Sequence, residues 1–364
     1  MRVIAVPTLN AENLRRELHA KGVVDPSVRI TKRSGEVLIP IIGPAPLDLA
    51  RFGARYEDEV HASLSPRRTP PNPRREIEER LRARGVPPEL APRRWERIGD
   101  ILVIRVSAAA RPHANVIAAA FGEVLRVRTV VEDRSGIHGP MRTPDVRVLW
   151  GDGTETVHVE AGVRYALDVG HIMFSSGNLA ERVALPARVR PGAVVVDLFA
   201  GIGYFALPIA LRSRARVVYA CEVNPVAFRY LTTNVRLNRA TNVIPRLGDC
   251  RDVAPRAVAD WVLMGHFDAR EYLDVAFDAL RGRGSIVYHE LCPKEQYPDA
   301  LTRRLAAAAR SHWMNVVSIR TRIVKSYAPG IVHATAELAV TPQTRRSATE
   351  MQISDGHLGT SVME

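Results

Sequence analysis

The most regular pattern in the chain is an alternation of short apolar runs with longer amphipathic stretches between residues 167 and 341. Five apolar runs predict buried strands, and a helical pattern follows each one. These runs begin at Val194, Val217, Val243, Trp261 and Ser285. Strands separated by helices indicate an α/β fold, in which helices wind over both faces of a parallel sheet.

The end of this region departs from the alternation. Apolar stretches at 316–324 and 333–340 predict two more strands, and the short segment 326–330 between them contains a proline and a glycine. A connection of this kind predicts a hairpin, so the last strand should run antiparallel to its neighbours. Residues 342–364 are polar and lack periodicity, which predicts a flexible tail.

Residues 1–60 predict a small α/β module that could fold as an appendage. Strands are expected at 1–6, 28–32 and 36–42, with a helix that follows an N-cap at Asn10.

Arginine and proline dominate residues 61–94, which predicts a stiff, positively charged linker interrupted by a helix at 76–84. Its arginines could meet RNA phosphates, or the segment could simply be solvated. Residues 95–166 predict a mixed α+β domain with a strand at 101–106 and a helix at 113–124. Further strands are expected near Thr129, Val146 and Val157.

The charge of the chain changes this picture. Its 364 residues carry a formal charge of +12, almost all of the positive charge coming from arginine. This balance favours a polyanionic partner, and nucleic acid fits better than a membrane because no basic amphipathic anchor stands out. Arginine also favours bidentate phosphate contacts and stacking on bases. A solvated basic surface would explain the same charge.

Other composition features narrow the class of protein. No run of eighteen apolar residues exists, and the N-terminus becomes polar too early for a signal peptide. Cys221, Cys250 and Cys292 lack the spacing of a zinc site or a disulfide framework. We therefore expect a cytoplasmic protein without a metal and, by default, a monomer.

Candidate chemistry gathers where the predicted parallel strands end. The first strand runs into Gly201 and Gly203, which let the backbone reverse and a ligand approach the next helix. Glu222 and Asp249 follow the next two strands, so these acids should meet the glycine turn at one edge of the sheet. Carboxylates there suit ribose hydroxyls and an adenine amino group, although each acid could instead be a helix cap. The set disfavours a phosphate-rich cofactor and predicts S-adenosylmethionine rather than NAD.

Three motifs, residues 165–175 (YALDVGHIMFS), 178–182 (NLAER) and 197–203 (DLFAGIG), make the chain recognisable. It resembles the class I methyltransferase-fold family that contains tRNA guanine-37 N1-methyltransferase and its sister, the wybutosine-pathway aminocarboxypropyl transferase. The resemblance covers nearly the whole chain. Residues 95–102 resemble the start of the family's middle domain, and residues 1–60 the small domain with which the methyltransferases grip the tRNA elbow.

The resemblance implies a set of contacts with S-adenosylmethionine, of which only the two acids and the turn glycines also follow from the sequence pattern. The implied set is Ser175, Arg182, Phe199, Gly201, Gly203, Glu222, Asp249, Cys250 and Gly265.

The residues after the fourth strand separate the two sisters. The methyltransferase carries Asn-Leu-Pro there, whereas this chain has Met264, Gly265 and His266. A Met-Gly-aromatic ending resembles the transferase, as do residues 286–290 and 325–333. The resemblance thus implies transfer of the 3-amino-3-carboxypropyl group to C7 of 4-demethylwyosine at position 37, beside the anticodon of phenylalanine tRNA.

Catalytic residues are less clear from the sequence. His266 stands where a tyrosine is expected, and Arg142 or Arg182 could hold the carboxylate of the donor. His289 and His333, like His266, are candidate bases. Two other functions stay open: a guanine-37 N1-methyltransferase with a degenerate strand-four motif, and a basic RNA-binding protein without catalysis.

Overall fold

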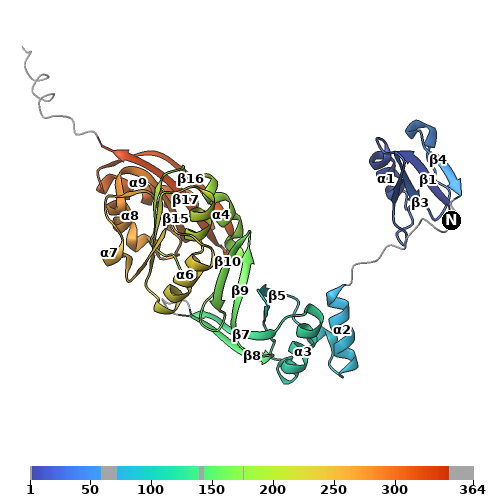
Figure 1. The fold of residues 1–364 in the computed structure, drawn as a ribbon, viewed down its shortest axis with the longest axis horizontal. Helices are drawn as coiled ribbons and strands as arrows, with labels where there is room; N and C mark the ends of the chain where they lie inside the picture. Colours follow the sequence, from blue (N-terminus) through green and yellow to red (C-terminus); the bar gives the residue numbers. More distant parts are fainter. Residues whose placement is uncertain (1, 59–71, 139–142, 175, 344–364) are drawn as a thin grey trace, which may run out of the picture. The chain divides into compact units, whose positions relative to one another are not determined.

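The computed structural model describes residues 2–58, 72–138, 143–174 and 176–343. It forms two compact units, with the division after Glu76 (Figure 1). Most of the predicted tail, residues 344–364, lies outside the described part of the chain.

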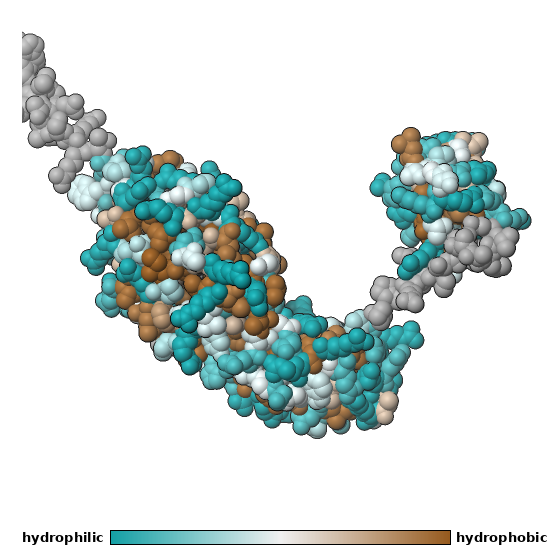
Figure 2. All heavy atoms as spheres, in the orientation of Figure 1, coloured by the Kyte–Doolittle hydropathy of each residue, from teal (hydrophilic) through white to brown (hydrophobic). Residues whose placement is uncertain are grey.

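The first unit is a four-stranded antiparallel sheet with one helix, α1 (Ala11–Ala20), on one face. Leu14 and Leu18 of α1 are fully buried in a core with Ile4 and Ile39. The strand order is β2 (Thr31–Arg33), β3 (Glu36–Pro40), β1 (Arg2–Pro7) and β4 (Arg55–Asp58). The sequence pattern missed β4, because its four residues, RYED, show no apolar alternation. Figure 2 shows the visible surface of this unit as mostly hydrophilic, as expected when its apolar positions are inside.

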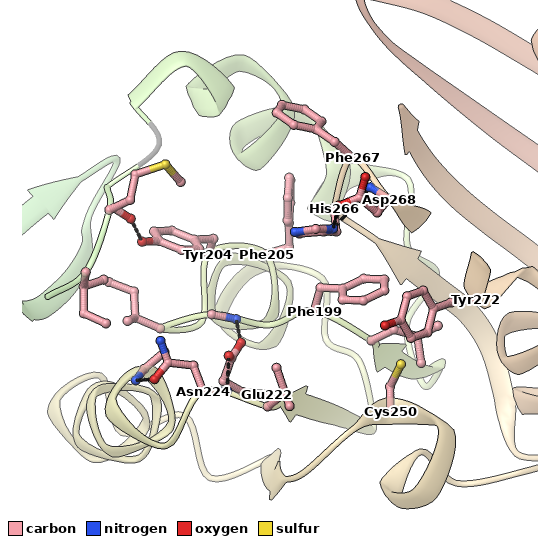
Figure 3. Close-up of a pocket in the computed structure, with 18 of the residues that line it drawn as sticks. Phe199, Tyr204, Phe205, Glu222, Asn224, Cys250, His266, Phe267, Asp268 and Tyr272 are labelled. Carbon is pink, nitrogen blue, oxygen red and sulfur yellow. Dashed lines mark hydrogen bonds and ion pairs between the residues drawn. The ribbon is translucent and has the colours of Figure 1, made fainter. Parts of the chain in front are cut away.

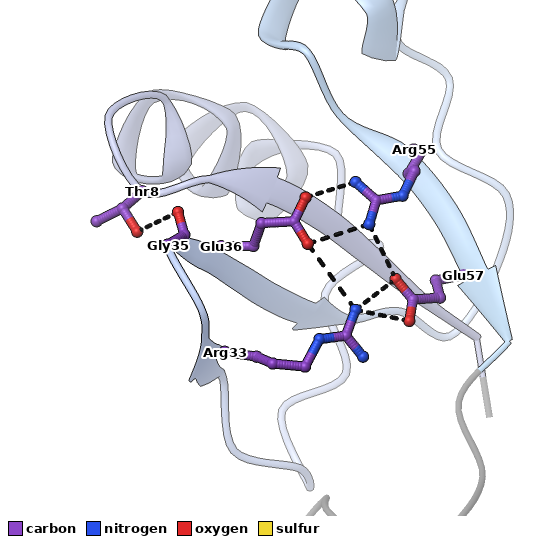
Figure 4. Close-up of polar contacts among 6 residues, drawn as sticks. All are labelled: Thr8, Arg33, Gly35, Glu36, Arg55 and Glu57. Carbon is purple, nitrogen blue, oxygen red and sulfur yellow. Dashed lines mark hydrogen bonds and ion pairs between the residues drawn. The ribbon is translucent and has the colours of Figure 1, made fainter.

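The opposite face of this sheet is covered by ion pairs (Figure 4). Arg33 and Arg55 each pair with both Glu36 and Glu57, at nitrogen–oxygen distances between 2.5 and 3.8 Å. A small apolar cluster on the sheet is almost completely buried; it consists of Val3, Ala5 and Leu38. The register places the four charged residues on the same face as this cluster, so we attribute its burial to their side chains.

The division between the two units falls within a helix that was expected to interrupt a linker. The helix α2 (Pro73–Ala83) buries Ile77 and Leu81 against α3 (Ala114–Leu125), and Val86 joins the same core. The described part of the predicted linker, residues 72–94, is therefore largely built into a folded domain, because the arginine-rich helix has one apolar stripe. Residues 61–71 lie outside the described residues.

Two small sheets complete the middle of the chain. The first has the order β5 (Trp95–Ile98), β6 (Ile101–Ile104), β7 (Thr129–His138) and β8 (Thr143–Trp150). The second is a hairpin of β9 (Glu155–Glu160) and β10 (Val163–Asp168).

The large sheet confirms the predicted doubly wound architecture. Its seven strands have the order β13-β12-β11-β14-β15-β17-β16, and β17 runs antiparallel to both of its neighbours, as the hairpin pattern predicted. The strands are β11 (Val194–Asp197), β12 (Val217–Glu222), β13 (Val243–Leu247), β14 (Ala259–Met264), β15 (Leu280–Pro293), β16 (Met314–Ala328) and β17 (Ile331–Pro342).

Helices cover both faces of this sheet. One core contains residues of α5 (Ala206–Arg212) and α6 (Pro225–Leu237), and the other contains residues of α8 (Leu273–Ala279) and α9 (Asp299–Ser311). Two further helices, α4 (Leu179–Ala184) and α7 (Cys250–Val253), are short. Every residue of β11 is buried, as predicted for a central parallel strand.

Candidate active site

A cavity of about 490 Å³ opens at the carboxyl ends of β11, β12 and β14 (Figure 3). This edge is where doubly wound sheets hold ligands, because the winding reverses beside the central strand. The walls come from the second unit: residues 171–173 and 178, 198–205, 222–227, 249–250 and 265–272.

The predicted glycine turn forms one wall of the cavity. Gly201 and Gly203 have φ angles of +56° and +99°, which residues with a side chain rarely adopt. A Cβ added to Gly203 would lie 2.7 Å from a methyl carbon of Leu207, and one added to Gly201 would meet the Tyr204 ring at the same distance. The turn therefore requires glycine at both positions, for backbone conformation and for space.

Glu222, at the end of β12, is fixed by two backbone donors. The amide of Gly201 donates to its Oε2 at 2.7 Å, and the amide of Asn224 donates to its Oε1 at 2.8 Å. Burial raises the pKa of this carboxyl, and the backbone amides of Asn224, Gly201 and Val223 oppose that shift. Because each carboxylate oxygen can accept more than one hydrogen bond, the lone pairs that remain are available to two hydroxyl groups of a ligand.

Asp249 lines the cavity and is also the N-cap of α7. Its Oδ1 accepts from the Arg251 amide at 2.9 Å, and the Arg251 guanidinium lowers the pKa of the carboxyl. Beside it, Cys250 is buried, which raises the pKa of its thiol to about 12 and keeps it neutral. Phe199 and Tyr272 meet edge to face at 5.1 Å and add an aromatic surface to the lining beside Cys250.

Gly265 and His266 both line the cavity wall. The Nδ1 of His266 accepts from the amide of Asp268 at 3.2 Å and lies 3.6 Å from the carboxylate of the same residue. Asp268 therefore helps to fix the orientation of the His266 ring at the cavity wall.

The other two candidate bases do not line the cavity. His289 and His333 are buried and joined by a 3.0 Å contact between Nδ1 and Nε2. Burial lowers the pKa of His289 to about 3, so it stays neutral. Their rings lie behind two aromatic residues of the wall, Phe205 and Phe267.

The expected contact at Arg182 needs correction, because this side chain is 2% exposed and is not among the lining residues. Its Nε and Nη2 donate to the carboxylate of Glu160 on β9, at 2.5 and 2.7 Å. The guanidinium also lies over the rings of Phe174 and Tyr204. In this structure Arg182 supports the wall of the cavity from behind.

Tyr204 is a wall residue that sequence reasoning missed. Its hydroxyl donates to the carbonyl of Met173, and its ring packs near those of Tyr165 and Phe174. Its place directly after the second glycine of the turn was the available signal. His171 and Asn178 also line the cavity without having been predicted as site residues.

Two predicted site residues, Arg142 and Ser175, lie outside the described residues. Within the part of the chain that is described, no cluster of three or more His, Cys, Asp or Glu side chains could hold a metal ion. None of the described helices is long and apolar enough to cross a membrane. All three cysteines are buried and free.

Comparison with known proteins decides the family. The TRM5/TYW2 methyltransferase domain model matches residues 156–317, and the TYW2 N-terminal domain model matches residues 77–154. A tRNA(Phe) (4-demethylwyosine(37)-C(7)) aminocarboxypropyltransferase of Methanocaldococcus jannaschii is 36% identical over 245 residues, which cover 67% of this chain and 96% of that protein. The chain belongs to the TRM5/TYW2 family. The predicted family and class I methyltransferase fold are thus confirmed.

The chain is similar in sequence and structure to members of both branches of the TRM5/TYW2 family. The crystal structure of Pyrococcus horikoshii TYW2 in complex with MeSAdo superposes with a TM-score of 0.67 at 34% identity, covering 74% of this chain and 99% of TYW2. The tRNA (guanine(37)-N(1))-methyltransferase Trm5b of Pyrococcus abyssi is 32% identical over 332 residues, 90% of this chain and 95% of Trm5b. A third model, the tRNA methyltransferase 5 N-terminal domain, matches residues 4–47. The chain therefore joins a TYW2-type middle domain to a Trm5-type first unit.

Proposed function

We propose that this protein transfers the 3-amino-3-carboxypropyl group of S-adenosylmethionine to C7 of 4-demethylwyosine at position 37 of tRNA(Phe). The observation that carries the proposal is the match to the M. jannaschii aminocarboxypropyltransferase over almost the whole length of that enzyme. The sequence after β14, Met264–Gly265–His266, supports the same choice, since it lacks the Asn and Pro expected of the methyltransferase. The basic charge of the chain is consistent with an RNA substrate.

The residues of the cavity fit the adenosine part of the donor. Glu222 would accept from the two ribose hydroxyls, and Asp249 would accept from the adenine amino group. The apolar surface formed by Phe199, Cys250 and Tyr272 would contact the adenine ring. These lining residues support the proposal that the cavity takes an adenosine-containing donor.

Catalysis would then be mainly positioning. Bound S-adenosylmethionine supplies an electrophilic γ-carbon next to its sulfonium, with methylthioadenosine as the leaving group. The protein has to align the acceptor base with that carbon, which can contribute up to roughly 7–11 kcal/mol when alignment is good. A Cβ added to Gly265 would lie 3.2 Å from a ring carbon of Phe205, so glycine leaves room at this wall, and His266 beside it would contact the donor or the base. Arg142 remains a proposed partner of the donor's carboxylate.

A labelling experiment tests this function directly. The protein is incubated with tRNA(Phe) that carries 4-demethylwyosine and with S-adenosylmethionine labelled either in the methyl group or in the aminobutyrate carbons. We expect only the aminobutyrate label in the RNA. Entry of only the methyl label would refute the transferase assignment.

A second activity is favoured by the similarity to Trm5b over 90% of this chain. Methylation of N1 of guanosine 37 is tested with an unmodified transcript and methyl-labelled donor. Incorporation there, together with aminobutyrate transfer to the modified tRNA, would show that one cavity supports both reactions.

A further inference from the structure

The cavity has an aromatic rim that the proposed cofactor contacts do not use. In Figure 3, Phe267 lies on the far side of the pocket from Glu222, with Phe205 and His266 between them. Phe267 directly follows His266 after β14 and is half-buried. A second molecule that enters beside a ligand held at Glu222 would therefore meet this rim.

The ring of Phe267 is held between two strands. Its centroid is 5.0 Å from that of His333 on β17 and 5.5 Å from that of Tyr327 on β16, both edge to face at 76°. His333 is itself fixed by the buried contact with His289. Edge-to-face contacts of this kind stabilise a defined ring orientation. Phe267 is thus a rigid support for Tyr327.

Tyr327 remains 55% exposed although it is large and aromatic. It lies at the end of β16, just before the turn that leads into β17. Among the described residues, the ring contact found for Tyr327 is the one with Phe267. An aromatic ring that is supported on one side and open to solvent on the other is a platform on which a flat base can stack.

A cation lies on the same strand. A Cβ added to Gly177 would collide with the Nζ of Lys325, which places this ammonium against the turn at Ser176–Asn178. Asn178 of that turn lines the cavity. Lys325 and Tyr327 thus bring a positive charge and an aromatic ring to the rim, which are the two groups that recognise the phosphate and the base of a single-stranded nucleotide.

We propose that Tyr327, supported by Phe267, is the stacking surface for the target base of the tRNA, and that Lys325 contacts a phosphate next to that base. Tyr327 is a positioning residue in this proposal, since it holds the acceptor and takes part in no bond change. The inference deepens the proposed function and rests on it, because a modified nucleotide in the anticodon loop is the assumed acceptor.

The test compares Tyr327→Ala with Tyr327→Phe. The alanine variant should raise the KM for tRNA(Phe) carrying 4-demethylwyosine by roughly 5- to 150-fold, as expected for one lost stacking contact. Its Kd for S-adenosylmethionine, measured by calorimetry, should stay within about twofold of wild type. Tyr327→Phe should behave like wild type, because the ring rather than the hydroxyl provides the stacking. Trp313→Ala is the matched control, since Trp313 is 76% exposed next to the opposite end of β16.

Lys325→Ala tests the phosphate contact. It should lower the slope of log Kd against log salt for the same tRNA by about 1, without changing affinity for S-adenosylmethionine. Two results would overturn the proposed phosphate contact of Lys325: an unchanged slope of log Kd against log salt, or a loss of affinity for S-adenosylmethionine without a loss of affinity for tRNA.

Three results would overturn the role of Tyr327. They are a KM for tRNA within twofold of wild type in Tyr327→Ala, an equal defect in Tyr327→Phe, and a parallel loss of affinity for S-adenosylmethionine. Thermal melting of each variant shows whether it is folded, and the phenylalanine variant keeps the packing on Phe267. Affinity for tRNA is also measured by filter binding without turnover. A wild type that binds tRNA but transfers no aminobutyrate label would refute the proposed function and leave the stacking result readable.

Discussion

Removal of the Glu222 carboxylate is the sharpest test of the cofactor site. In the structure each of its oxygens accepts one backbone amide, from Gly201 or from Asn224. Because a carboxylate offers more acceptor sites than these amides occupy, acceptor capacity remains for the ribose hydroxyls. A hydrogen bond to a charged group contributes about 1.5–3 kcal/mol. In the alanine variant, water can replace part of the lost hydrogen bonding. We therefore assign the free energy of one charged hydrogen bond, rather than two, to the two ribose contacts together.

Glu222→Ala should therefore weaken the binding of S-adenosylmethionine by roughly 10- to 150-fold, as measured by isothermal titration calorimetry below the melting temperature. Asp252→Ala is the control. It removes a negative charge from α7 without touching the cavity lining, and its Kd should stay close to that of wild type. A Kd for Glu222→Ala within about twofold of wild type would remove this residue from the ribose role.

The same carboxylate predicts a pH dependence. Burial raises the pKa of Glu222, and only the ionised form can accept from both hydroxyls and both amides. Affinity for S-adenosylmethionine should fall as the pH is lowered through this raised pKa, at a higher pH than for an ordinary glutamate. Glu222→Gln should bind weakly at every pH and lose that dependence. A midpoint that is unchanged in Glu222→Gln would assign the titration to another group.

Three further predictions concern stability and the first unit. Glu160→Ala leaves Arg182 buried without its carboxylate, so the free energy of unfolding in urea should fall by about 3–5 kcal/mol, and a loss below about 1 kcal/mol would contradict a supporting role. Burial raises the pKa of Asp197 from 3.8 to about 7. Between these two values the folded state binds a proton that the unfolded state has lost, so the free energy of unfolding should fall as the pH rises through this range. Asp197→Asn should abolish this part of the pH dependence of unfolding in urea, and an unaltered profile would contradict it. Deletion of residues 1–72 should raise the KM for whole tRNA(Phe) but not for its anticodon stem-loop, and an equal change for both substrates would argue against a separate contact by the first unit.

The sequence located the site through a rule that depends only on topology. Glu222 and Asp249 were found because they follow strands whose carboxyl ends must share one edge of a parallel sheet. The position of Arg182 could not be found in this way, since a charged residue on a short helix usually lies at the surface. Its burial depends on Glu160, which belongs to a different element.

The strand β10, which the sequence pattern did not predict, also depends on contacts between distant parts of the chain. The strand β10 pairs with β9 outside the large sheet, and its residues Val163–Asp168 do not form an uninterrupted apolar run. The role proposed for Tyr327 depends on the exposure of its ring. Buried and exposed positions alternate only weakly along β16, so the local sequence pattern does not predict this exposure. Local propensity therefore predicted the sheet, and the non-local pairs required the structure.

The anchoring of Tyr204 has a thermodynamic consequence for ligand binding. Its hydroxyl is bonded to Met173, and its ring is enclosed by Tyr165, Phe174 and the guanidinium of Arg182. A side chain that is immobilised before a ligand arrives has no rotamer entropy left to lose, whereas ordering a free side chain costs about 0.5–1.5 kcal/mol. This wall of the cavity is therefore preorganised, so little of the donor's binding energy is consumed in assembling it.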